Sequence, residues 1–285
     1  MREYLEWEDV ARIEVNAPDL PGITIESGSL RFYPQGESAF HALGYVGAVS
    51  PKHKTGDRLL ELPGFKVGLS GVEQTFDLAL RGKAGSSQLE VNALGRVIRE
   101  LDRKEGKTGQ NIVLTIDTSL QKQAMKALEG KTGSIVVLDV HTGATMVQAS
   151  SPSFDPNNFT NGLSENEWKE LSEDERAPLR NKAIAGEYAP GSTFKMIVAL
   201  AALEAGIINK NTSFFCSGSL TLGDGKFHCW KRHGHGLTNL KKGISQSCDV
   251  YFYELSRRVG IDRIAIMAKR FGLGQNLDLD ISTIF

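Results

Sequence analysis

Short alternations of apolar and polar residues dominate the first hundred positions of the chain. The segments 11–15 and 23–27 repeat with the period of two that half-buried strands show, and prolines and glycines separate such runs. This punctuation is typical of turns between short strands. Residues 1–105 are therefore predicted to form an irregular, β-rich domain. The charged segment 102–110 has no apolar period and is predicted to be a linker.

A different pattern begins after the predicted linker. Residues 111–117 are rich in β-branched types and predict a strand. An amphipathic helix follows, which Asp117 or Thr118 can cap and which ends at Gly130. Two apolar runs separated by a short glycine-containing loop predict a β-hairpin formed by residues 134–140 and 144–150.

The rest of the chain alternates between polar excursions and helical segments. Residues 151–187 are polar and predict a surface excursion with one short helix. A helix is predicted from Ser192 to about residue 205, followed by a loop rich in glycine, cysteine and histidine over 207–238. Further helices are predicted near Leu240 and after Asp249.

The composition is that of an ordinary globular protein. Of the 285 residues, 40% are apolar and 24% are charged, which suits two domains, predicted at 1–105 and 109–285. The net charge of −1 gives no basic excess that would hold a nucleic acid. The longest clean apolar run, 196–203, is far shorter than the roughly 20 residues of a membrane span. The first ten residues lack the apolar core of a signal peptide, so neither an anchor nor a signal peptide is expected in this chain.

Two serine-x-x-lysine patterns are candidates for nucleophilic catalysis. A serine and a lysine at this spacing share one face of a helix, where a desolvated lysine can act as a base toward the hydroxyl. Ser119 and Lys122 open an amphipathic helix, where a cap and a solvated lysine are expected. Ser192 and Lys195 open a helix that is apolar on every face and therefore predicted to be buried, which favours them as nucleophile and base. A capping serine with a lysine that reaches solvent is the alternative.

A second hydroxyl and a carboxylate lie later in the chain. Ser247 and Asp249 fall between two predicted helices. Ser247 can relay a proton between Lys195 and a leaving group, and Asp249 can orient the lysine. Alternatively, both residues simply cap the helix that follows.

These residues lie in segments that resemble penicillin-binding proteins. YAPGSTFK (188–195), followed by the Ser-x-Asp element at 247–249, is similar to the first two of three motifs of that family. The opening of the family's transpeptidase domain resembles NIVLTIDTSLQ, GSIVVLDVHTGATMVQASSPSFDPNNF and NKAIAGEYAPGSTFK. The non-catalytic pedestal of class B members resembles LPGITIES, RFYPQGESAFHALGYVG and GLSGVEQTFDLALRGKAG. The segments FHCWKRHGHG and SQSCDVYFYELSRRVG resemble the elongation-type members, so the resemblance covers nearly the whole chain.

The resemblance implies a fold and a chemistry. The fold is α+β, with a β-rich pedestal and a transpeptidase domain whose antiparallel sheet is flanked by helices. The chemistry is that of a peptidoglycan D,D-transpeptidase at the periplasmic face of the inner membrane, which cleaves the D-Ala-D-Ala bond of a stem peptide and is acylated by β-lactams. Carried over by motif, Ser192 is the nucleophile and an oxyanion-hole donor through its N–H, Lys195 is the base, Ser247 is the proton relay and Asp249 is its companion. The pedestal is expected to bind membrane partners of cell elongation.

The third motif of the family, Lys-Thr/Ser-Gly on a strand after the second motif, is expected to be missing here. The chain has three such tripeptides, at 54–56, 107–109 and 131–133, and all of them precede Ser192. The chain is therefore expected to be incomplete at both ends, to expose an apolar face of the helix after Ser192, and to be inactive alone. A non-catalytic fragment that keeps only pedestal interactions is the alternative. A class D β-lactamase or a β-lactam sensor is disfavoured by the pedestal-like residues 20–85.

All three cysteines fall in one short window together with histidines. Thiolates and an imidazole form the tetrahedral ligand set of structural zinc, although the spacing is not that of a zinc finger. His235 is preferred over His228 and His233 because its flanking glycines suit a tight ligand turn, and the resemblance also favours metal ligands here. Scattered thiols, or one disulfide and a free cysteine, are the alternatives. No cofactor is expected for acyl transfer itself, and the predicted zinc ligands are Cys216, Cys229, His235 and Cys248.

Overall fold

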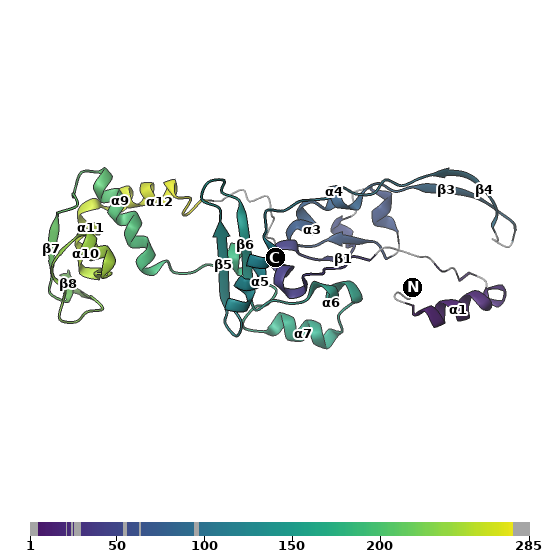
Figure 1. Cartoon of the computed structure of the whole chain (residues 1–285), viewed down its shortest axis with the longest axis horizontal. Helices are drawn as coiled ribbons and strands as arrows, with labels where there is room; N and C mark the ends of the chain where they lie inside the picture. Colours follow the sequence, from purple (N-terminus) through teal and green to yellow (C-terminus); the bar gives the residue numbers. More distant parts are fainter. Residues whose placement is uncertain are drawn as a thin grey trace. The chain divides into compact units, whose positions relative to one another are not determined.

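The computed structural model describes residues 5–20, 22–23, 25, 30–53, 56–62, 64–93 and 97–275. The chain divides into two compact units, of which the first runs up to Glu187 and the second begins at Tyr188. Both units contain helices and two-stranded antiparallel ladders, so the predicted α+β class is confirmed (Figure 1). No helix within these described ranges is long and apolar enough to cross a membrane.

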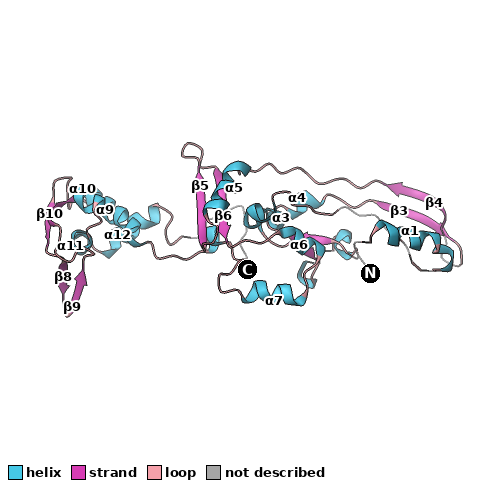
Figure 2. Ribbon diagram, turned by 60° about the horizontal axis from the view of Figure 1, so that its bottom comes forward, coloured by secondary structure: helices cyan, strands magenta, loops and turns pink. Residues whose placement is uncertain are grey.

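The first hundred residues combine short helices with two ladders. In one ladder, β1 (Val46–Ala48) pairs with β2 (Lys66–Gly68). In the other, β3 (Ser86–Val91) pairs with β4 (Val97–Lys104) in an extended hairpin that Figures 1 and 2 both show. The helices of this region are α1 (Trp7–Val15), α2 (Phe40–Leu43), α3 (Gly71–Thr75) and α4 (Asp77–Arg81).

The predicted strand at residues 11–15 is wrong, because this segment lies inside α1. An alternation of five residues is too short to exclude a helix, and Trp7, Val10 and Ile13 repeat at helical spacing. The other predicted strand, at 23–27, falls largely outside the described residues.

The predicted linker at 102–110 is also structured in part. Its first three residues belong to β4, and Lys107 forms an isolated antiparallel bridge with Lys83. Charged side chains on an exposed hairpin carry no apolar period, so this strand has no signature in the hydrophobic pattern. The division into domains 1–105 and 109–285 stays a prediction.

A cluster of aromatic rings holds the short helix α2 in the first unit. Phe40 stacks on Phe159 and Tyr45, with ring centroids 6.1 and 6.0 Å apart. His41 is buried beside them, and its Nε2 lies 2.8 Å from the carbonyl oxygen of Pro178. Burial lowers the pKa of His41 to about 4, because the imidazolium form would lose its hydration.

The buried His41 predicts that this unit loses stability in mild acid. The unfolded chain binds the proton near pH 6.5 and the folded chain only near pH 4, so the stability is complete above pH 6.5 and is lost as the pH falls toward 4. The loss between pH 7 and pH 5 is expected to be about 2 kcal/mol. Urea unfolding of the parent and of His41→Gln at both pH values measures it, and the variant should show the smaller change. Equal pH dependence of the two proteins would contradict the prediction.

The helix and hairpin predicted after residue 110 are confirmed. The side chain of Asp117 accepts hydrogen bonds from the N–H groups of Ser119 and Leu120 and so caps the helix. The helix packs against the hairpin (Figure 1). The elements are α5 (Thr118–Ala127), β5 (Gly133–Leu138) and β6 (Thr145–Ser151), with β5 and β6 antiparallel.

The strand predicted at 111–117 does not form. This segment instead makes isolated hydrogen bonds to β6. Thr115 Oγ1 donates to Thr145 O, and the Asp117 N–H donates to Met146 O. The polar excursion predicted at 151–187 contains three short helices where one was expected. These are α6 (Pro156–Asn161), α7 (Glu165–Glu173) and α8 (Lys182–Ala185).

The second unit contains the other predicted helices. A 3₁₀ turn, Gly191–Phe194, leads into the first of them. The predicted loop at 207–238 is wrong, because it contains four short strands. Two antiparallel ladders result, β7 with β10 and β8 with β9. The elements are α9 (Lys195–Glu204), β7 (Ser213–Cys216), β8 (Ser219–Leu222), β9 (Gly225–His228), β10 (Gly236–Asn239), α10 (Leu240–Ser245), α11 (Asp249–Val259) and α12 (Ile261–Arg270).

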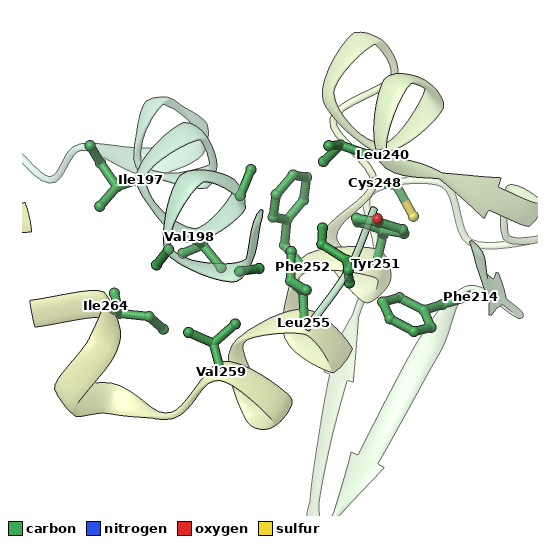
Figure 3. Close-up of a cluster of buried hydrophobic side chains, with 14 of the residues drawn as sticks. Ile197, Val198, Phe214, Leu240, Cys248, Tyr251, Phe252, Leu255, Val259 and Ile264 are labelled. Carbon is green, nitrogen blue, oxygen red and sulfur yellow. The ribbon is translucent and has the colours of Figure 1, made fainter. Parts of the chain in front are cut away.

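The core of the second unit lies between α9, α11 and α12 (Figure 3). Tyr251 and Leu255 of α11 are fully buried one helical turn apart, and the Tyr251 ring lies beside Phe214 of β7. This packing fixes where α11 begins, and therefore where the residues just before it lie.

One face of α9 does not take part in this core. Met196, Leu200 and Leu203 recur at helical spacing and are 54%, 41% and 38% exposed. The prediction of burial on every face is thus wrong for these three residues, and the predicted exposed apolar face of this helix is confirmed.

Candidate active site and metal centre

The nucleophile candidate lies in the turn that begins the central helix of the second unit. Pro190 and Gly191 precede Ser192, and Gly191 has a φ of +54°, in the left-handed region that suits glycine. This bend leaves Ser192 exposed in a 3₁₀ turn, while Lys195 begins α9 and is half-buried. The two side chains thus share one end of the helix.

The ammonium group of Lys195 has an acceptor for each of its three N–H donors. Its Nζ donates to Ser247 Oγ at 2.9 Å, to Ser247 O at 3.1 Å and to Asp249 Oδ1 at 2.6 Å. The lysine is therefore held by the Ser-x-Asp element and does not simply extend into solvent.

Ser247 connects the lysine to the nucleophile candidate. Its Oγ donates to Ser192 Oγ at 2.9 Å and accepts from Lys195. Ser247 has a φ of +50°, a conformation that costs a residue with a side chain about 1–2 kcal/mol. The neighbouring backbone compensates, because Cys248 N–H donates to Gly243 O at 2.9 Å. The structure thus brings together all four residues that the sequence singled out for catalysis.

Asp249 is held by two donors, one on each carboxylate oxygen. Oδ1 accepts from Lys195, and Oδ2 accepts from the backbone N–H of Trp230 at 3.0 Å. Burial acts to raise the pKa of Asp249, but these two hydrogen bonds outweigh it and hold the pKa below its usual value. Neither Ser247 nor Asp249 caps α11 through its side chain, since Cys248 occupies the N-cap position and makes no side-chain cap bond.

The competing serine-x-x-lysine pattern has the ordinary role that was expected. The N–H of Ser119 is bound by Asp117 at the start of α5, and the side chain of Lys122 is exposed.

Trp230 is a residue of the site that the sequence analysis did not identify, and it contacts Asp249. Its only signal is its position directly after Cys229, because its partner Asp249 lies far away in the sequence.

The four predicted metal ligands also come together. The ligand atoms of Cys216, Cys229, His235 and Cys248 all lie within 4.8 Å of one another, and all four residues are buried. His235 Nδ1 is 3.7 Å from Cys216 Sγ and 3.5 Å from Cys229 Sγ. A tetrahedral zinc ion with its usual bond lengths places nitrogen and sulfur ligands about 3.6 Å apart, so these residues fit the ion.

Close backbone packing places His235 in this cluster. Gly234 has a φ of +74°, and a Cβ atom there would lie 2.1 Å from Cys216 O, so only glycine allows this approach. Lys242 Nζ donates to His235 O at 2.7 Å and fixes the same turn from the other side. Of the rival histidines, His228 and His233 are exposed and lie outside the cluster.

The cluster is poorly satisfied by the protein's own groups. Burial, together with the neighbouring Cys216, raises the pKa of Cys248 to about 12, because adjacent buried thiolates repel each other. His235 Nε2 is buried and has no hydrogen-bond partner among the described residues. The three cysteines form no disulfide. A donor set of this kind suits a cation that neutralises the thiolates.

A hydroxyl linked to a lysine through a second hydroxyl, at the start of a helix, is an arrangement that serine acyl transfer can use. The chain belongs to the penicillin-binding proteins. Residues 133–283 match the penicillin binding protein transpeptidase domain, and residues 1–114 match the penicillin-binding protein dimerisation domain.

Curated relatives of this chain include peptidoglycan D,D-transpeptidases. The MrdA protein of Escherichia coli strain K12 is 35% identical over 96% of this chain and 44% of its own length. That of Acinetobacter baumannii is 38% identical over 92% of this chain and 39% of its own length. The chain therefore spans less than half the length of these curated relatives.

Solved structures show the same likeness. PBP2 in the complex with MreC from Helicobacter pylori has a TM-score of 0.87 and 32% identity, and the match covers 99% of this chain and 53% of that one. Pseudomonas aeruginosa PBP2 in complex with WCK 5153 has a TM-score of 0.75 and 34% identity, with 90% and 53% covered.

Proposed function

We propose that this chain carries the nucleophile and the proton relay of a peptidoglycan D,D-transpeptidase, with Ser192 as the residue that is acylated. The observation that carries the proposal is the continuous hydrogen-bond chain from Ser192 through Ser247 to Lys195 and Asp249. The substrate is the D-Ala-D-Ala end of a stem peptide, and β-lactams acylate the same hydroxyl.

The chemistry follows from that chain. With Lys195 neutral, Ser192 passes its proton to Ser247, which passes its own to Lys195, while Ser192 Oγ forms a bond to the peptide carbonyl. The proton returns along the same path to the departing amine of D-alanine, and the ammonium of Lys195 is already positioned for that step. An amine from a second stem peptide then attacks the acyl carbonyl, the ester bond to Ser192 Oγ breaks, and a proton of the amine returns to Ser192, which leaves the two strands crosslinked. Asp249 accepts a hydrogen bond from Lys195 and keeps the lysine in reach of Ser247.

The direct test is the mass of the Ser192 peptide after incubation with benzylpenicillin. We expect an adduct on Ser192, because its hydroxyl is the one linked to Lys195 through Ser247. Ser192→Ala should abolish the adduct, and Ser119→Ala, which changes the competing pattern, should leave it. An adduct that survives Ser192→Ala, or a folded parent that never forms one, would contradict the proposal.

A second proposal concerns the metal. We propose that Cys216, Cys229, His235 and Cys248 hold one structural Zn²⁺. The ligand spacing supports this, as do the absence of disulfides among these cysteines and the backbone approach that only Gly234 allows. Zinc is not needed for acyl transfer. Its contribution is to hold the loop on which Ser247 and Asp249 flank one of the four ligands.

The partners and location are proposed from the family. The H. pylori relative forms a complex with MreC, which supports an elongation partner for the part of this chain that matches the dimerisation domain. We propose that the chain acts at the periplasmic face of the inner membrane, where its peptidoglycan substrate is found.

A further inference from the structure

Trp230 contacts the proton-relay segment on both sides of Ser247. Its indole Nε1–H donates to Gln246 O at 3.0 Å, and its backbone N–H donates to Asp249 Oδ2 at 3.0 Å. One residue therefore fixes the carbonyl that precedes Ser247 and the carboxylate that follows it. Ser247 itself has the left-handed backbone conformation that needs such support.

Core packing does not explain this tryptophan. Its side chain is 64% exposed, and its described ring contact is an edge-on approach to His235 with centroids 5.4 Å apart. A tryptophan that buries so little gains little from the hydrophobic effect. Its two hydrogen bonds to the relay segment are the contacts that distinguish it from an ordinary surface residue.

The position of Trp230 is tied to the cysteine cluster. Trp230 follows Cys229 directly, and Asp249 follows Cys248 directly. The two thiols belong to one cluster, so the hydrogen bond from Trp230 to Asp249 joins the residues that come immediately after two of its members. An interaction that fixes Cys229 and Cys248 therefore also fixes the carboxylate of Asp249, which accepts from Lys195.

We infer that Trp230 is a positioning residue for acylation, which holds the Ser247 hydroxyl between Ser192 and Lys195 and links this relay to the cysteine cluster. The inference rests on the proposed function. We expect the indole N–H to increase the rate of the chemical step and to leave the affinity for the β-lactam unchanged.

The test uses Trp230→Phe, which keeps an aromatic ring beside His235 and removes only the indole donor. Acylation of Ser192 is measured over a series of benzylpenicillin concentrations. We expect the saturating rate to fall about tenfold, the effect of one hydrogen bond on a rate. The half-saturating concentration, the zinc content and the thermal midpoint should equal those of the parent. Phe227→Leu is the matched control, because Phe227 is a half-exposed aromatic residue of the neighbouring strand β9 that contacts Tyr253 and not the relay.

Each result decides the inference. A Trp230→Phe protein with the parent's saturating rate overturns it. A changed half-saturating concentration would show that the ring binds the ligand, and a loss of zinc or a lower thermal midpoint would show a structural role; either result overturns the positioning role. A parent with no adduct on Ser192 overturns the proposed function and this inference together, whereas a labelled parent with an equally fast variant overturns the inference alone.

Discussion

The Cys229→Ser protein is expected to lose its zinc. Structural zinc sites contribute about 10–16 kcal/mol through four ligands, so the removal of one thiolate should cost about 3 kcal/mol, roughly 100-fold in affinity. The ligand atoms lie close together and buried, so no water molecule readily replaces the lost sulfur. Elemental analysis of protein purified under reducing, chelator-free conditions measures the zinc content of the parent and the variant.

The two neighbouring histidines supply the matched pair for this experiment. His235→Ala should lose the metal as Cys229→Ser does, whereas His233→Ala, which changes an exposed histidine outside the cluster, should keep it. Metal loss should also lower the thermal stability of the second unit, because β7 and β10 are held together beside the cluster. A parent without zinc, or both ligand variants with full zinc, would show that the site does not exist.

Removal of the Ser247 hydroxyl is expected to slow the acylation of Ser192 by 10²-fold or more, the usual contribution of a positioned proton-transfer group. Lys195 makes no direct contact with Ser192 in the described hydrogen bonds, and Ser247 Oγ bridges the two. Ser247→Gly is the sharper variant, because glycine adopts the φ of +50° without strain. Its fold and zinc content should therefore match the parent while the rate of adduct formation falls.

Ser245→Ala provides the control for this substitution. Ser245 is an exposed serine of α10, two residues before Ser247, and its hydroxyl donates to the backbone carbonyl of Lys242. Its replacement should leave the acylation rate unchanged. If Ser247→Gly acylates as fast as the parent, Lys195 reaches Ser192 by another route and the relay as described does not operate.

The sequence predicted elements well where the determining contacts are local. Asp117 caps α5 through N–H groups two and three residues ahead, and β5 and β6 are joined by a short loop. The strand prediction for residues 11–15 was wrong because no such local contact marks this segment. Its alternation fits a strand as well as a helix, and α1 buries none of its described side chains, so no core contact marks its face in the pattern.

The strands of the 207–238 region show what local patterns miss. Each is only four residues long, so their hydrophobic period is too weak to detect. The pairing of β7 with β10 is decided by partners distant in the chain, in the register that sets Cys216 opposite Gly236, whereas β8 and β9 are joined by a tight turn. The sequence indicated that the cysteines and His235 belong together, and the backbone approach at Gly234 is the distant contact that places this histidine against them.

The sequence by itself determined the residue types of the site: a serine and a lysine at helical spacing, a Ser-x-Asp element, and three cysteines with a histidine. Only the tertiary structure decided how they connect. The packing of α9 against α11 sets Lys195 beside Ser247 and Asp249, and it places the Ser247 hydroxyl within hydrogen-bond distance of Ser192. The physical reason is that a hydrogen bond depends on positions within a few tenths of an ångström. For residues more than fifty positions apart, that precision comes from the buried core and not from the spacing in the sequence.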